Sequence, residues 1–316
     1  MSFEFFLGSL EIGLIYALVS LGVFISFRLL DFPDLTADGS FPLGGAICGL
    51  CLYTGVDPWI ATLLGTLGGC IAGMITGWLY VKLNILQLLS SIIVMIGLYS
   101  INLRILGLGP YIMDETSRMA GSPNLSLLDA KTIFSPFINA DYTNQYIVQP
   151  LMILGFVLVL WWLVNSFLNT QKGLALRATG TNARMAKAQG IPTGGITILG
   201  MAISNGLIAL GGSLFVQTQG GADITIGVGT IVIGLASIII GESVFPAKRM
   251  WVILLSVIIG SILYRLFIAI ALGNELLQSI GIGTEDLNLI TAILVVLALV
   301  LPKQLKKWLR KRGKSA

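Results

Sequence analysis

"NTQKGLALRATGTNARMAKAQGIP", from Asn169 to Pro192, is a basic segment set between two long apolar runs. Only 11% of the 316 residues are charged, yet this stretch carries several basic residues and no acidic one. The basic residues are Lys172, Arg177, Arg184 and Lys187. A segment of this kind between apolar runs predicts a water-exposed loop between membrane spans.

Apolar runs long enough to cross a bilayer recur along the sequence, which is 55% hydrophobic with a mean hydropathy of +0.91. A span needs about 20 apolar residues, and about a quarter of a typical soluble domain is charged. The sequence therefore predicts an all-α polytopic membrane protein with one transmembrane domain over residues 1–316. We expect about nine spans, at residues 5–27, 41–54, 58–80, 84–106, 146–168, 194–217, 226–242, 250–272 and 286–302.

The orientation of the spans follows from lysine and arginine, which gather in cytoplasmic loops. With an external N-terminus and an internal C-terminus, four of the 19 basic residues lie off the cytoplasmic side, namely Arg104, Arg118, Lys131 and Arg265. This N-out, C-in threading predicts an external loop at 107–145, a cytoplasmic loop at 169–193 and a basic cytoplasmic tail at 303–316. The tail is also explained by contact with anionic lipid. The external loop is either a binding surface or a solvated loop without a partner.

Two segments resemble each other, "DLTADGSFPLGGAICGL" from Asp34 and "DITIGVGTIVIGLASII" from Asp223. In the predicted topology they open on opposite sides, so residues 5–106 and 194–302 would form inverted repeats with short, broken helices. Chance similarity is the alternative. Residues 41–54 extend only about 21 Å as a helix, less than the hydrocarbon core of about 30 Å. The loop before them must therefore dip inward, or the bilayer must thin.

Irregular backbone at membrane depth is tolerated where it is buried in protein or lines a cavity. The candidate substrate-pathway residues are therefore Asp34, Thr36, Asp38, Ser40, Asp223 and Thr225. We expect Ser40 to be the N-cap of the short helix, with Pro42 in its first turn. The alternative is that Asp34 and Asp38 only cap and position the loop.

Other residues inside the spans predict helix contacts. Intramembrane charges usually pair or face a cavity, so we expect an ion pair between Glu11 and Arg265, although Arg265 could instead snorkel outward. Small residues recur at every fourth position in the third span and predict the close approach of another helix. They are Ala61, Gly65, Gly69, Gly73 and Gly77.

Several kinds of chemistry are excluded by missing residues. The chain has no histidine, the commonest transition-metal ligand and acid–base catalyst, so we expect no metal site. It has no phosphate-binding G-x-x-x-x-G-K-[ST] loop, so it cannot hydrolyse a nucleotide itself. The cysteines Cys48, Cys51 and Cys70 fall in apolar runs and are interpreted as packing residues.

The opening stretch has clear helix signals. Asn182 or Thr181 can cap a short helix from Ala183 to Gln189 that stops at Gly190. "GLALRATGTNARMAKAQGI" resembles the cytoplasmic loop of permease subunits of ABC importers in the branched-chain amino-acid and ribose permease family. The matching positions are Gly173, Arg177, Ala178, Gly180, Asn182, Ala186, Gly190 and Ile191. "GLIALGGSLF" continues the similarity, and "DLTADGSFPLGGA" resembles a subgroup linked to aromatic or other amino acids.

The resemblance implies that this loop is a coupling helix that docks into a separate ATPase, and that ATP and Mg²⁺ bind to that subunit. The coupling residues would be Arg177, Asn182, Arg184, Ala186, Lys187 and Gly190. It also implies a second permease copy, most simply an identical one, and an extracytoplasmic substrate-binding protein. The expected location is the bacterial inner membrane, and no nucleic-acid partner is expected.

The favoured interpretation is the permease subunit of an ABC importer for a small polar solute, most simply an amino acid. The same mechanism could import a sugar or a nucleoside. The alternatives of a different class are an ion-coupled secondary transporter, with the ion at Asp31, Asp34 or Asp38, and a non-transporting membrane scaffold.

Overall fold

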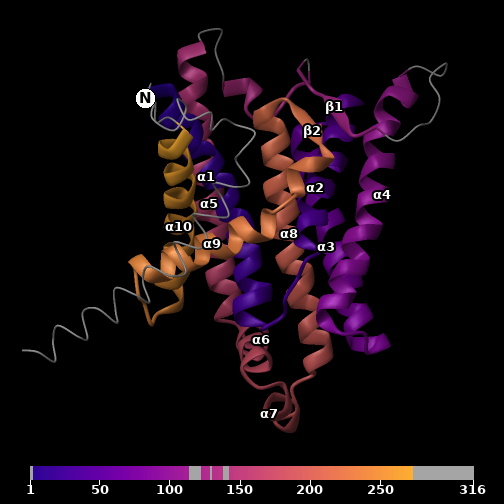
Figure 1. The fold of residues 1–316 in the computed structure, drawn as a ribbon, viewed down its shortest axis with the longest axis vertical. Coiled ribbons are helices and arrows are strands. Elements are labelled where there is room, and N and C mark those ends of the chain that lie inside the picture. Colours follow the sequence, from indigo (N-terminus) through magenta and orange to yellow (C-terminus); the bar gives the residue numbers. More distant parts are fainter. Residues whose placement is uncertain (1–2, 114–121, 129, 138–141, 273–316) are drawn as a thin grey trace, which may run out of the picture.

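The computed structural model describes residues 3–113, 122–128, 130–137 and 142–272, and most of them are helical (Figure 1). The α-helices are α1 (Phe3–Val23), α2 (Ala37–Tyr53), α3 (Pro58–Leu83), α4 (Gln87–Met113), α5 (Tyr142–Leu168), α6 (Gln171–Thr181), α7 (Ala183–Ala188), α8 (Thr193–Gln219), α9 (Thr230–Val244) and α10 (Met250–Leu272). A π-helix, η1 (Phe24–Leu29), extends α1, and η2 (Ser135–Phe137) and η3 (Ile224–Gly227) are short 3-10 helices. Two strands, β1 (Asn124–Ser126) and β2 (Gly221–Asp223), pair antiparallel.

Seven of the described helical segments are long and apolar enough to cross a membrane. They coincide with seven of the predicted spans and confirm an all-α polytopic membrane protein. The predicted short segment at 41–54 lies within α2, whose 17 residues extend about 25 Å. The predicted ninth span, 286–302, lies outside the described residues.

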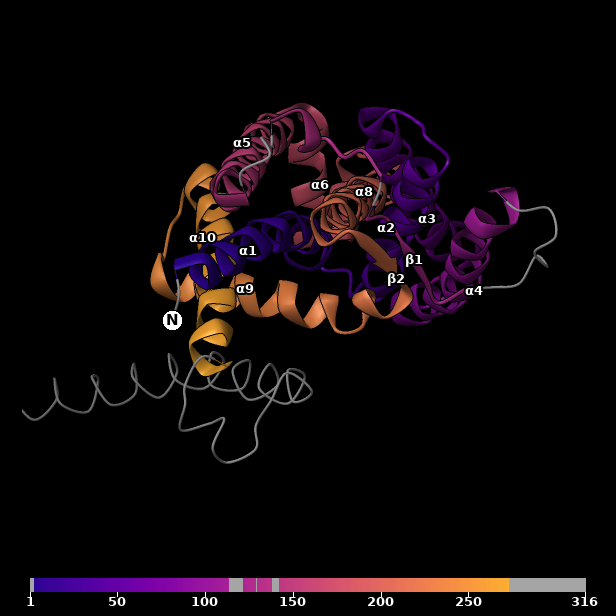
Figure 2. The ribbon, with the colours of Figure 1, turned by 90° about the horizontal axis from the view of Figure 1, so that it is seen from above.

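The spans that contain α1 and α8 form the centre of the bundle. Seen from above, α8 lies between α1 on one side and α2 with α3 on the other (Figure 2). In the most apolar stretch of each helix, 83% of the residues of the α1 span and 72% of those of α8 are buried. The shares for α4 and α5 are 33% and 28%. The helices α4 and α5 therefore present apolar side chains to lipid or to another protein.

The contact between α3 and α8 is made through glycine. An added Cβ at Gly69 would collide with Asn205 O on α8, and one at Gly73 would collide with Met201 O. Small residues on one face allow two helix backbones to approach this closely. This confirms the close approach predicted from the four-residue spacing in the third span.

An aromatic cluster joins three helices of the core, α1, α2 and α8. The ring of Phe41 on α2 stacks on Tyr16 of α1 with centroids 5.7 Å apart, and lies 5.7 Å from the ring of Phe215 on α8. Phe41 is fully buried. The N-terminal half of α2 is thereby clamped between α1 and α8.

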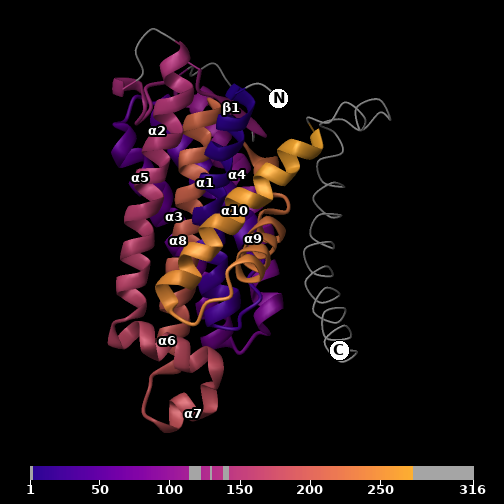
Figure 3. The same cartoon turned by 90° about the vertical axis from the view of Figure 1, so that its left-hand side faces the viewer.

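The two ends of the bundle differ in structure. The start of α1 and the β1–β2 sheet lie at one end, whereas α6 and α7 extend beyond the other end (Figures 1 and 3). In the sheet, Leu125 pairs with Ala222, and both are buried. Ile133 N–H donates to Gln217 Oε1 of α8 at 3.0 Å. Part of the predicted external loop is therefore folded onto the end of α8.

Candidate transport site and coupling segment

The loop between η1 and α2 is shaped by Asp34. Its Oδ1 accepts a hydrogen bond from the Thr36 N–H at 3.0 Å, and α2 begins at the next residue, Ala37. The predicted N-cap, Ser40, was wrong because the Asp34 turn starts the helix earlier. The Ser40 hydroxyl lies inside the helix and donates to Asn205 Oδ1 at 2.7 Å.

Buried hydrogen bonds tie this loop to the core. Asn205 on α8 donates from Nδ2 to Asp34 Oδ2 at 2.7 Å. The hydroxyl groups of Thr36 and Thr76, on α3, lie 2.8 Å apart. These side chains and that of Ser40 are all buried, so the polar groups of the loop satisfy one another and fix its position.

A second turn of the same kind precedes α9. Asp223 Oδ1 accepts from both the N–H and the hydroxyl of Thr225, each at 2.6 Å. Gly229 then adopts φ +81° and leads into α9 without a side-chain cap. The helix that follows has 15 residues. Both Asp-x-Thr segments found in the sequence therefore fold as turns that precede short helices.

Asp38 of α2 supplies the cap that α9 lacks. Its Oδ1 accepts from the Ile231 N–H at 2.9 Å, and its Oδ2 accepts from the Gly229 N–H at 3.3 Å. A carboxylate at a helix N-terminus satisfies free N–H groups and faces the positive end of the helix dipole. An added Cβ at Gly227 would collide with the Asp38 carbonyl oxygen. The N-terminal ends of the two short helices therefore meet at Asp38.

Two of the candidate pathway residues line one cavity. Asp38 and Thr225 both face a space of about 520 Å³ between α2, α4 and η3. The other candidates hold the two turns, and they are Asp34, Thr36, Ser40 and Asp223. The sequence did not point to Asn205, which donates to Asp34, or to Asn102, which lines the cavity. A polar amide inside an apolar span was the available signal in each case.

In the described part of the chain, Glu11 and Arg265 do not form the predicted ion pair. α10 packs against α1 at Gly13, where an added Cβ would lie 3.4 Å from Arg265 Cβ. Glu11 precedes Gly13 by two residues, which is about 200° around an α-helix. Its side chain lies beside Thr218 of α8. The side chain of Glu11, on α1, and that of Arg265, on α10, therefore lie on different sides of α1.

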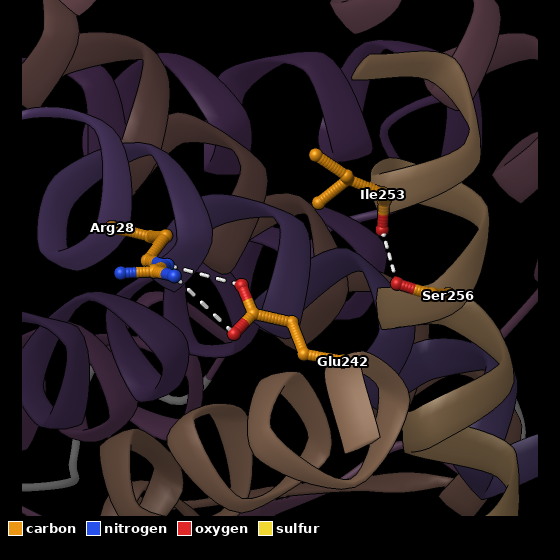
Figure 4. A network of polar contacts seen from close by, with 4 residues as sticks. All are labelled: Arg28, Glu242, Ile253 and Ser256. Atoms are coloured by element: carbon orange, nitrogen blue, oxygen red, sulfur yellow. Dashed lines mark hydrogen bonds and ion pairs between the residues drawn. The ribbon is translucent and has the colours of Figure 1, made fainter. Parts of the chain in front are cut away.

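An ion pair that the sequence did not reveal joins η1 to α9. Arg28 Nε lies 3.0 Å from Glu242 Oε1, and Arg28 Nη2 lies 3.5 Å from Glu242 Oε2 (Figure 4). Nearby, the Ser256 hydroxyl donates to Ile253 O within α10. The Arg28 side chain is 61% exposed, so water screens the pair and its contribution to stability is modest.

The basic segment folds as two short capped helices. Thr170 Oγ1 accepts from the Gly173 N–H at 3.3 Å at the start of α6. Asn182 Oδ1 accepts from the Met185 N–H at 3.0 Å at the start of α7. Gly190 follows α7 with φ +78°. The predicted capped helix that stops at Gly190 is confirmed, one residue shorter than expected.

The side chains of α7 point in two directions. Arg184, Met185 and Lys187 are exposed, whereas Ala186 is fully buried. Ala186 therefore packs inside this chain and is not part of the surface that α7 presents. Arg177, on α6, is half-buried. The exposed surface of α7 is a basic flank beside apolar side chains, of which Met185 is the largest.

α6 packs directly on the end of the first span. An added Cβ at Gly180 would collide with Leu29 O. Leu176 is fully buried, and an added Cβ at Gly200 of α8 would lie 2.8 Å from Leu176 and 2.6 Å from Leu30. The α6–α7 segment therefore contacts the residues that lead into the Asp34 turn.

Comparisons with known proteins agree with this architecture. The chain is 41% identical over 284 residues to a tyrosine transport system permease protein of Clostridioides difficile, covering 90% of this chain and 86% of that protein. It is 27% identical over 213 residues to a Methanocaldococcus jannaschii protein named for branched-chain amino acid transport, covering 65% and 64%. A solved structure of PsaBC from Streptococcus pneumoniae in complex with Fab shares the fold, with a TM-score of 0.51, 16% identity and coverage of 94% and 91%.

The family match extends over almost the whole chain. Residues 5–301 match the family described as the branched-chain amino acid transport system permease component. The seven membrane-length helical segments of the described residues, the two Asp-x-Thr turns and the α6–α7 segment fall within those residues. With its membrane-length helices, the chain is a multi-pass protein of the inner membrane. It belongs to this family of amino-acid permeases of ABC importers.

Proposed function

We propose that this permease imports an aromatic amino acid, with its N-terminus outside the cell and α6–α7 in the cytoplasm. The relative with 41% identity is named for tyrosine transport, and it aligns over most of both chains. Basic residues support the orientation, since cytoplasmic ends of spans collect them. The end of the bundle that carries α7 also carries Arg28 at the end of η1, Lys82 in the last turn of α3, and Lys248.

The proposed architecture is a pair of inverted repeats, residues 5–106 and 194–302. Its support is the matched Asp-x-Thr turns and the two short helices whose N-terminal ends meet at Asp38. The proposed pathway runs through this meeting point, where a rocking of one half against the other would open it to either side.

The observation that carries the proposal is the α6–α7 segment. α7 presents Arg184 and Lys187 beyond the end of the bundle, while α6 is packed without a gap on Leu29 and near Leu30. A partner that grips α7 would therefore move the loop held by Asp34. We propose that the partner is a separate ATPase, which binds ATP and Mg²⁺. A cleft of about 870 Å³ beside α7, lined by Asn84 and Lys187 among others, would receive part of it.

Two further partners complete the proposal. The apolar faces of α4 and α5 are poorly buried, and a second copy of this chain would cover part of them. An external binding protein would deliver the amino acid to the end that carries β1 and β2. Membership of the family implies both an ATPase and a binding protein.

The test reverses charge on α7. Arg184→Glu with Lys187→Glu is expected to abolish co-purification of the ATPase and to lower uptake of labelled tyrosine at least about tenfold, because like charges at an interface repel. Lys248→Glu is the matched control, since it changes an exposed lysine at the same end of the bundle in another loop. Full uptake by the α7 variant at normal protein level would favour ion-coupled transport instead.

A further inference from the structure

The cavity of about 520 Å³ between α2, α4 and η3 has a polar wall built by all three elements. Asp38 lines it from α2, Asn102 from α4 and Thr225 from η3. Small-molecule sites have volumes of about 300–1,000 Å³ and combine apolar walls with a few polar groups. The cavity therefore has the size of a site for a single small solute.

Asn102 has a buried oxygen without a hydrogen-bond partner among the described residues. The side chain is fully buried, and its Nδ2 donates to Gly39 O at 3.2 Å. That bond fixes which end of the amide is the donor. Asn102 Oδ1 has no partner. A buried acceptor without a donor is unfavourable, and Asn102 lines the cavity, so a molecule in the cavity is the candidate source of a donor for this oxygen.

The other two polar groups of the wall are also acceptors. Asp38 accepts two N–H groups from α9, and a carboxylate has about four lone-pair sites. Thr225 donates its hydroxyl hydrogen to Asp223 at 2.6 Å, so its oxygen can still accept. The wall therefore offers three acceptors and one negative charge. A primary ammonium group has three N–H donors and a positive charge, which match the wall in number and in sign.

The remainder of the cavity suits an apolar side chain. Met95, Ile96 and Val228 line it. Tyr99 and Ser100 line it as well, and their hydroxyl groups can donate to a carboxylate. A lipid acyl chain would fill the apolar part but has no donor for Asn102. An amino acid with an apolar side chain has a group for each part of the wall.

We propose that this cavity binds the transported amino acid, with its α-ammonium group on Asn102, Asp38 and Thr225 and its side chain against Met95 and Ile96. The inference rests on the proposed function and assigns its solute to a site. Such a site would bind amino acids with aromatic or large aliphatic side chains in preference to sugars and nucleosides, because sugars and nucleosides lack the ammonium group.

The experiment measures binding to the full chain, purified with its bound subunits in lipid nanodiscs. The readout is the shift of the thermal unfolding midpoint with L-phenylalanine or with 3-phenylpropionate, which differ only in the ammonium group. Asn102→Leu removes the acceptor at similar side-chain volume. Asn165→Leu is the matched control, since Asn165 on α5 also has a buried oxygen without a partner and lies outside the cavity.

We expect L-phenylalanine, but not 3-phenylpropionate, to stabilise the wild type and Asn165→Leu. Asn102→Leu is expected to keep the midpoint of the unliganded protein and to weaken L-phenylalanine binding at least about tenfold, the loss of one good hydrogen bond to a charged group. If Asn102→Leu does not fold, Thr225→Val at an exposed position is expected to weaken binding in the same way.

Unchanged affinity in the variants, equal binding of both probes, or no binding to the wild type would overturn the site. Uptake of labelled phenylalanine and tyrosine by cells distinguishes failure of the proposed site from failure of the proposed importer function. Uptake by the wild type together with unchanged binding in Asn102→Leu refutes the site and leaves the importer standing. Absence of amino-acid uptake by the wild type refutes the importer itself.

Discussion

The pair α2–α3 packs against α8, and the pair α9–α10 packs against α1, but the two contacts differ in closeness. An added Cβ at any of four glycines of α3 would come closer to α8 than van der Waals contact allows, namely at Gly65, Gly69, Gly73 and Gly77. α10 meets α1 at Gly13, where an added Cβ would lie 3.2 Å from Ile262 Cα. The first pair therefore makes close glycine contacts with α8 along the length of α3, whereas the second pair makes fewer such contacts with α1.

Within the second pair, α9 and α10 are closely joined. An added Cβ at Gly241 would collide with Ser256 O, and one at Gly260 would collide with Ser237 O. The Asp38 cap and the Arg28–Glu242 ion pair are among the polar links from this pair to the first half. α9 and α10 therefore form a closely packed pair that has fewer close glycine contacts with α1 than α3 has with α8.

The largest expected effect comes from adding one methyl group to each contact. Gly73→Ala should lower the free energy of unfolding by about 3 kcal/mol, because α3 cannot move off α8 without losing its other close contacts. Gly13→Ala should change it by less than about 1 kcal/mol, since Ile262 can shift slightly. Thermal unfolding in detergent measures both. Gly155→Ala is the control, as nothing lies within 4 Å of its added Cβ. Equal losses of stability in Gly73→Ala and Gly13→Ala would contradict the difference in closeness between the two helix contacts.

An intermediate effect is expected from the two Asp-x-Thr turns. Asp34→Ala removes a buried carboxylate that accepts from Thr36 and Asn205, and should destabilise by about 2–3 kcal/mol. Asp223→Ala affects a partly exposed turn and should cost about 1 kcal/mol. Denaturation midpoints of the two variants, with Asp223→Asn as a cap-preserving control, give the ranking. A larger loss of stability in Asp223→Ala than in Asp34→Ala would mean that the turn before α9 contributes more to stability than the turn before α2.

The smallest effect is expected at the exposed ion pair. A double-mutant cycle of Arg28→Ala and Glu242→Ala should give a coupling energy of about 0.2–1 kcal/mol. The coupling should fall further in 0.5 M salt, since salt screens exposed charges. A coupling above about 2 kcal/mol that resists salt would mean that α9–α10 is fastened more firmly than its packing indicates.

Local patterns predicted the parts of this molecule that depend on neighbours in sequence. Apolar runs located the spans, and Asn182 with Gly190 located α7, because caps act over a few residues. The position of Ser40 misled, since the Asp34 turn competes for the same helix start. The Asp38 cap was not predictable, as its N–H partners lie 191 and 193 residues away. Nor could apolarity alone tell which face of α1 carries Glu11.

The Asp38 cap also bears on how the chain is assembled during synthesis. The residue that completes α9 leaves the ribosome about 190 residues before α9 does, so the second half is finished on a template that the first half has already supplied. A fragment that begins at α8 would lack Asp38, so the Gly229 and Ile231 N–H groups would lose this acceptor. The dependence runs both ways, since a fragment that ends before α8 would leave Asp34 without its Asn205 donor and Asp38 without both N–H groups.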